Sequence, residues 1–227
     1  MKQIGLIGGM SWESSAVYYS IINKLVSEKL GGLHSARIIM DSVDYDHFTS
    51  LQHDDNWQQI GADLSEIAQK LEHYGASCVA ISCNTMHHVS QDVVKNLNIP
   101  FVHIAEVAAK AVEKAKLNKV LLLGTKFTME KDFFTDELSK YQIEAEIPNE
   151  VDRLYVHNAI YNEFCKGIFK DETKTEILKI IAKHQDVQGV ILGCTELPML
   201  IKPEDLDIPS FDTTYLHCEA LVEIALG

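Results

Sequence analysis

Short, mostly apolar segments alternate with longer amphipathic segments along the chain. The short segments are rich in Val, Ile, Leu and Ala, and most of them end in Gly or a small polar residue. This pattern is typical of strands that are buried on both faces of a parallel sheet. We expect such strands at residues 3–8, 36–43, 78–82, 100–104, 119–124 and 189–193.

The segments between these strands have helical spacing. Ile60, Leu64, Ile67 and Leu71 recur at intervals of three or four residues, and residues 177–182 show the same spacing. Such positions lie on one face of a helix and predict burial against a sheet. Strands that alternate with helices in this way predict an α/β fold in which helices flank a central, mainly parallel sheet.

The chain contains a weak internal repeat. Residues 4–9 (IGLIGG) resemble residues 120–125 (VLLLGT), and residues 79–85 (VAISCNT) resemble residues 190–196 (VILGCTE). Each match alone is short, but the two matches occur in the same order and about half the chain apart. The repeat therefore predicts two pseudo-symmetric halves.

The length of 227 residues is enough for two small domains. We expect the first domain to comprise residues 1–102 and 213–227 and to carry Cys83, and the second to comprise residues 103–212 and to carry Cys194. Ligand sites in parallel sheets lie beyond the carboxyl ends of the strands. The active site is therefore expected in a cleft between the two domains.

Cys83 and Cys194 occupy matching positions in the repeat. Each ends an apolar strand pattern and is followed by polar residues suited to a helix start, residues 84–85 and 195–196. A helix N-terminus favours a thiolate, and its free N–H groups can bind a carboxylate. Each half is thus expected to offer a reactive thiol beside an anion site.

Two matched thiols suit a reaction that acts on both faces of one carbon. Racemisation removes a proton from one face and returns a proton to the other, and the acid and base exchange roles with the direction. Backbone N–H groups could stabilise the enolate-like carbanion. The alternative is that both thiols are small core residues, the interpretation that we favour for Cys78, Cys165 and Cys218.

Other chemistries find less support in the sequence. Five scattered cysteines without a CxxC pair indicate free thiols in a reducing compartment. Cys83 and His87 could share a helix face as metal ligands, but no third ligand is near them in sequence, so we expect no metal. Residues 5–9 lack the GxGxxG spacing of a dinucleotide site.

The net charge of −13 argues against nucleic acid as a partner, because phosphate binding requires a basic surface. The first residues lead directly into an apolar strand, and no apolar run approaches the roughly 18 to 20 residues of a membrane span. We expect a cytoplasmic protein without a signal peptide or membrane contact.

Three motifs resemble those of the aspartate/glutamate racemase family. They are GGMSWES at residues 8–14, SCNTMH at residues 82–87 and GCTELP at residues 193–198, and the likeness extends over nearly the whole chain. The resemblance implies a racemase of acidic amino acids that needs neither pyridoxal phosphate nor another cofactor or metal. It also implies a homodimer, with Cys83 and Cys194 as the two catalytic thiols.

The same resemblance implies a set of substrate-binding positions. These are Asn84, Thr85, Thr125 and Thr195 for the α-carboxylate and amino group, Met10 as a lining residue, and Gln52 and Lys166 for the distal part of the substrate.

Three points remain open in this assignment. Lys166 could hold a distal anion or be a solvated surface lysine. Glu196 could assist Cys194 in proton transfer or only complement a helix dipole. Aspartate-specific members carry an arginine in the loop after the second strand, whereas residues 44–48 (DYDHF) contain none. Glutamate, or a broader set of amino acids, is therefore as open as aspartate.

Two further functions are compatible with these residues. One is cis–trans isomerisation of an unsaturated diacid, as in the related maleate isomerases, with one cysteine as nucleophile and the other as acid. The other is a catalytically inert protein that binds acidic amino acids.

Overall fold

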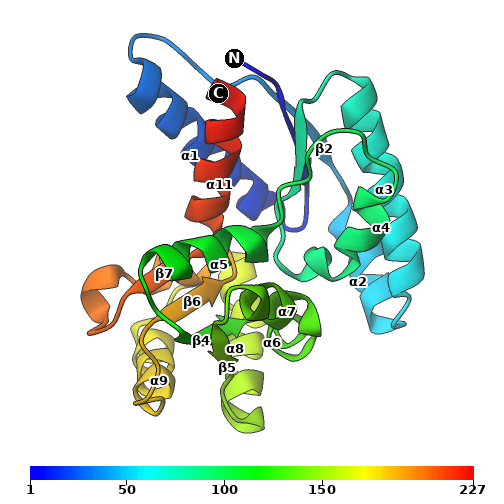
Figure 1. Cartoon of the computed structure of the whole chain (residues 1–227). Coiled ribbons are helices and arrows are strands. Elements are labelled where there is room, and N and C mark those ends of the chain that lie inside the picture. Colours follow the sequence, from blue (N-terminus) through cyan, green and yellow to red (C-terminus); the bar gives the residue numbers. More distant parts are fainter. The chain divides into compact units, whose positions relative to one another are not determined.

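The computed structural model describes residues 1–227. The chain divides into two compact units: unit 1 comprises Met1–His103 and His217–Gly227, and unit 2 comprises Ile104–Leu216 (Figure 1). None of the helices combines the length and the apolar character that crossing a membrane would require.

Unit 1 is built around a three-stranded parallel sheet in the order β2-β1-β3. Its strands are β1 (Ile4–Gly8), β2 (Ile38–Ser42) and β3 (Cys78–Ile81). Its helices are α1 (Trp12–Leu30), α2 (Tyr45–His53), α3 (Trp57–His73), the 3₁₀ helix η1 (Thr85–Val89) and α4 (Ser90–Val94), and α11 (Thr213–Leu226) begins in unit 2 and continues in unit 1.

Helices cover both faces of this sheet. In Figure 1, α1 and α11 lie on one side of the strands of unit 1, and α2, α3 and α4 lie on the other. The buried face of α3 carries Ile60, Leu64 and Leu71, which pack in one cluster with Ile7 and Ile81 of the strands. Each such side chain contributes about 1.5–3 kcal/mol of hydrophobic free energy, so the predicted helical pattern is what attaches α3 to the sheet.

Unit 2 is built around a four-stranded parallel sheet in the order β5-β4-β6-β7. Its strands are β4 (Lys119–Gly124), β5 (Glu144–Glu146), β6 (Val190–Gly193) and β7 (Ser210–Asp212). Its other elements are α5 (Ile104–Lys114), α6 (Lys126–Glu130), α7 (Asp132–Lys140), α8 (Glu150–Asn162), η2 (Phe164–Lys166), α9 (Asp171–Ala182), α10 (Leu197–Leu200) and η3 (Pro203–Asp205).

The central strand β4 of unit 2 is buried on both faces. Leu121 and Leu123 point into a cluster with helices α8 and α9, whereas Val120 and Leu122 point into a second cluster with α5 and α7. This alternation is the strand period of two residues. It explains why β4 reads as a continuous apolar run in the sequence.

The predicted fold class is confirmed, since both sheets are parallel and flanked by helices. One expected strand is wrong. Within residues 100–104 only Phe101 forms a bridge, to Val79, and Ile104 already begins α5. Pro100 has no N–H to donate and α5 follows at once, so the segment is too short for a strand. Strands β5 and β7 were not expected, because each has three residues and includes charged or polar side chains.

Candidate active site

Serine side chains join the loop before Cys83 to the start of α1. Ser14 Oγ donates to the carbonyl oxygen of Ser82 at 3.0 Å, and Ser15 Oγ lies 3.3 Å from Ser82 Oγ. Gly9 N donates to Ser15 Oγ at 2.8 Å. The turn after β1 and the turn after β3 therefore meet at one edge of the sheet of unit 1, which is the edge where both strands end.

Gly9 allows the first of these turns to approach β2 closely. Its φ is +92°, and a Cβ at this position would lie 2.2 Å from the carbonyl oxygen of Val43. Only glycine fits such a contact without displacing backbone. The glycines of the GGMSWES motif thus have a structural role in shaping this edge.

Cys83 is half-buried in this edge, and a buried histidine holds its backbone. His87 Nδ1 lies 2.9 Å from the carbonyl oxygen of Cys83, and because a carbonyl only accepts, Nδ1 is the donor. Burial and the neighbouring His103 lower the pKa of His87 well below its usual range. His87 is therefore neutral, and it fixes the position of the Cys83 backbone.

The other residues of unit 1 that the sequence singled out are buried. Asn84 and Thr85 follow Cys83 and open η1, and Met10 packs in the core cluster of α3. Gln52, in the last turn of α2, is 6% exposed, and its Nε2 has no hydrogen-bond partner. Leaving a buried amide nitrogen without a partner costs free energy. Nε2 of Gln52 is therefore a candidate hydrogen-bond donor to a bound ligand.

Strands β4 and β6 of unit 2 are in close contact where they end. A Cβ on Gly124 would lie 2.9 Å from the carbonyl oxygen of Gly193, and a Cβ on Gly193 would lie 2.8 Å from that of Leu123. Thr125 follows Gly124 and caps α6, accepting from Thr128 N at 3.2 Å. Two predicted site positions, Thr125 and Cys194, therefore follow neighbouring strands at the same edge.

Cys194 donates a hydrogen bond to Glu196. The distance from Sγ to Oε2 is 2.9 Å, and the two residues are 9% and 6% exposed. Burial raises the pKa of the Cys194 thiol well above its usual range, and the Glu196 carboxylate and then Cys165 raise it further. Cys194 is therefore held as a protonated thiol.

For Cys194 the expected effect of the helix N-terminus is outweighed. Burial and the Glu196 carboxylate raise the pKa of the thiol, and the hydrogen bond from the Glu196 backbone lowers it by less. The helix that follows, α10, has four residues, and Glu196 at its N-cap makes no side-chain capping bond. A dipole this short is weak, whereas a carboxylate in contact with the sulfur carries a full negative charge. The carboxylate and burial therefore decide the protonation state.

Cys165 is a neighbour of this pair that the sequence did not reveal. Its Sγ lies 3.8 Å from Glu196 Oε1, and the residue is half-buried and packs against the core cluster of unit 2. The two residues are far apart in sequence, so no local spacing signals the contact. Lys166, next in the chain, has an exposed side chain, and Thr195 is buried beside Cys194.

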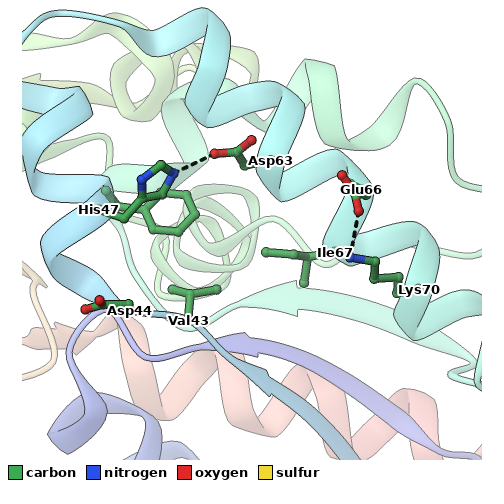
Figure 2. Close-up of a pocket in the computed structure, with 8 residues that line it drawn as sticks. Val43, Asp44, His47, Asp63, Glu66, Ile67 and Lys70 are labelled. Atoms are coloured by element: carbon green, nitrogen blue, oxygen red, sulfur yellow. Dashed lines mark hydrogen bonds and ion pairs between the residues drawn. The ribbon is translucent and has the colours of Figure 1, made fainter.

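A surface pocket of unit 1 is distinct from these residues (Figure 2). It has a volume of about 320 Å³ and lies between α2 and α3. Two side-chain pairs line it, His47 with Asp63 at 2.9 Å and Lys70 with Glu66 at 2.6 Å. None of the predicted site residues lines it, so it is not the candidate site. Its lining residues are Val43, Asp44, His47, Phe48, Asp63, Glu66, Ile67 and Lys70.

The sequence profile of the Asp/Glu/Hydantoin racemase family matches residues 7–221, and therefore includes both cysteine-bearing edges. The chain belongs to this family. The family resemblance of the three sequence motifs is thereby confirmed. No group of three or more His, Cys, Asp or Glu side chains in this family member is arranged to hold a metal ion.

Individual family relatives agree with this assignment. A candidate Asp/Glu racemase from Yersinia pestis is 42% identical with a TM-score of 0.94, and an aspartate racemase homologue from Pyrococcus horikoshii OT3 is 35% identical with a TM-score of 0.88. Both matches cover 100% of each chain. A glutamate racemase from Staphylococcus epidermidis is 29% identical over 160 residues, which cover 64% of this chain and 55% of that protein. The chain spans about half the length of the curated relatives it matches.

Proposed function

We propose that this protein is a cofactor-independent racemase that interconverts the L- and D-forms of an acidic amino acid. The observation that carries the proposal is one cysteine at the equivalent place of each sheet. Cys83 follows β3, which pairs with β1, and Cys194 follows β6, which pairs with β4. The family and the names of the relatives support aspartate, glutamate or a broader set that includes them as substrate.

The two cysteines act as a pair of bases in this proposal. In one direction the Cys83 thiolate removes the α-proton, and the Cys194 thiol gives its proton to the opposite face of the same carbon. One C–H bond and one S–H bond break and one of each forms, so the configuration inverts and the proton ends on Cys83. In the other direction the two cysteines exchange roles.

The surroundings of Cys194 support its role as the acid of the resting enzyme. Burial and Glu196 raise its pKa, so it enters the reaction with a proton to give. The 2.9 Å contact with Glu196 also fixes the direction of the S–H group. In this proposal Glu196 assists Cys194 in proton transfer, which is the first of the two roles that the sequence left open.

Hydrogen-bond donors near each cysteine hold the substrate in this proposal. The buried Nε2 of Gln52 is a donor without a partner, which suits the distal carboxylate. Lys166 is exposed and could add its charge at the same end of the substrate. The remaining assignments are Asn84, Thr85, Thr125 and Thr195 to the α-carboxylate and amino group, and Met10 to the lining.

We further propose that the protein acts in the cytoplasm as a homodimer of two-domain subunits. The proposed domains are residues 1–102 with 213–227, and residues 103–212. All five cysteines are free thiols, which supports a reducing compartment. Val151 and Leu154 expose apolar surface on α8, which supports contact with a second subunit.

Single cysteine variants test the proposed reaction. Cys83→Ser and Cys194→Ser should each lose roughly a hundred- to ten-thousandfold in turnover. At neutral pH a hydroxyl loses its proton far less readily than a thiol, so serine is a poor base and a poor acid in this reaction. Circular dichroism at fixed wavelength follows the loss of optical activity from either enantiomer. A variant that keeps near-normal turnover in both directions would show that its cysteine is not one of the two bases.

A further inference from the structure

Two thiols of unit 2 share one buried carboxylate. Cys194 Sγ lies 2.9 Å from Oε2 of Glu196, and Cys165 Sγ lies 3.8 Å from Oε1 of the same side chain. A carboxylate can only accept, so each S–H group is a donor. The proposed proton transfers use Cys194 and leave Cys165 without a role.

A short helix holds Cys165 in this position. It lies in η2, whose backbone is closed by Lys166 N donating to Glu163 O and by Gly167 N donating to Phe164 O, both at 2.9 Å. Gly167 ends the turn with φ +70°, in the left-handed region. The neighbouring Phe164 is buried in the core of unit 2, which anchors the turn.

The environment of Glu196 makes each donor important. The side chain is 6% exposed, and a buried carboxylate stays charged only when donors stabilise it. Cys194 and Cys165 each donate to one oxygen of this carboxylate, so both thiols help to hold it in place.

We propose that Cys165 is a positioning residue: its thiol donates to Oε1 of Glu196, holds Oε2 directed at Cys194, and so keeps Cys194 protonated between turnovers. The inference rests on the proposed function, in which Cys194 is the resting acid. Its electrostatic basis is that burial and then the Glu196 carboxylate raise the pKa of Cys194.

Two substitutions separate the hydrogen bond from other effects of Cys165. Cys165→Ala removes the donor, so Oε2 of Glu196 is no longer held against Cys194 and the Cys194 thiolate meets less negative charge. Cys165→Ser keeps a donor but cannot ionise, so it should preserve the wild-type behaviour. Cys218→Ala is a matched control, because Cys218 is a buried thiol directed at a backbone carbonyl, Tyr18 O, at 4.0 Å.

The test is a titration of Cys194 in full-length protein labelled with ¹³C at the cysteine β-carbons. Cys194→Ser identifies the resonance, and far-UV circular dichroism fixes the alkaline range in which the fold is intact. We expect the Cys194 curve of Cys165→Ala to move about half to one pH unit lower, a roughly three- to tenfold gain in thiolate at fixed pH. Cys165→Ser and Cys218→Ala should follow the wild-type curve.

Two results would overturn the inference. The first is a titration curve of Cys194 in Cys165→Ala that superimposes on the wild-type curve. The second is a curve in Cys165→Ser that moves as far as the curve in Cys165→Ala. In the second case the charge on Cys165, rather than its hydrogen bond, would be responsible. The titration needs no turnover. If the wild-type protein racemises its substrate and either result is obtained, only the proposed role of Cys165 is contradicted. If the wild-type protein does not racemise acidic amino acids, the proposed function is contradicted.

Discussion

Sγ of Cys194 lies 2.9 Å from Oε2 of Glu196, and less than a tenth of either residue is exposed. Thr85 stands where the internal repeat would place the counterpart of Glu196, so Cys83 has no acid two residues after it. The two halves are therefore alike in topology and different in charge. The two thiols therefore have different surroundings, although the proposed reaction requires each to serve as acid and as base.

Removing the charge of Glu196 should change the ionisation of Cys194. Glu196→Gln keeps the size of the side chain but not its negative charge, so the pKa of Cys194 should fall by roughly one to three units. The enantiomer whose α-proton Cys83 removes needs Cys194 protonated, so the alkaline limb of its kcat profile should move to lower pH. The other enantiomer needs Cys194 as the base, so the acid limb of its profile should move to lower pH. If neither limb moves, Glu196 does not control Cys194.

Gln52 should contribute to binding at the expense of stability. Gln52→Leu removes a buried amide nitrogen that has no partner, so the free energy of unfolding should rise by about 1 kcal/mol. The KM for dicarboxylic substrates should rise in the same variant. Urea unfolding and steady-state kinetics check the two effects together. A stability loss without a change in KM would mean that Gln52 is a structural residue.

Lys166 should matter for the distal carboxylate of the substrate. Lys166→Ala should raise the KM for dicarboxylic amino acids about tenfold and leave neutral amino acids unaffected, because only the former offer a second charge. Lys179→Ala is a suitable control, since Lys179 is an exposed lysine of unit 2 that pairs with Glu176. Equal losses for both substrate classes would place Lys166 outside the site.

Buried histidines should make unit 1 sensitive to acid. His217 donates to Val102 O through Nε2 and accepts from Tyr18 OH, and burial followed by His87 lowers its pKa to about 3. A lowered pKa means that the unfolded chain binds protons that the folded chain does not. Stability is therefore fully present above the ordinary histidine pKa of about 6.5 and is lost as the pH falls toward about 3.

Urea unfolding at a series of pH values measures this dependence. His217→Gln should lower stability at neutral pH but flatten its loss between about pH 6.5 and 3, because one of the groups that take up protons on unfolding is gone. His34→Gln, at an exposed position, should keep the wild-type slope. An unchanged slope in His217→Gln would show that other groups dominate acid unfolding.

The sequence predicted features that depend on local pattern. The continuous apolar run of β4 and the spacing of Ile60, Leu64 and Leu71 in α3 report burial directly, and both are present in the structure. The strand expected at residues 100–104 is not formed. The apolar pattern alone does not show that a helix begins at Ile104.

Features that depend on distant contacts could not be predicted. No spacing relates Cys165 to Glu196, because η2 and α10 meet only through the fold. The protonation state of Cys194 could not be predicted for the same reason, because the burial that outweighs the effect of the helix start arises from the fold. The sequence shows a helix start after the cysteine, but it shows neither that the helix has four residues nor that Glu196 turns back onto the sulfur.

Proton exchange in D₂O tests the two-base reaction most directly. Each enantiomer of aspartate and glutamate is incubated with the protein without pyridoxal phosphate, and the α-position of both enantiomers is followed by NMR at low conversion. The account predicts that deuterium enters the product enantiomer while the remaining substrate keeps its proton, because different groups remove and deliver the proton. Absence of α-exchange for a panel of acidic amino acids, or return of the original proton to the product, would contradict it.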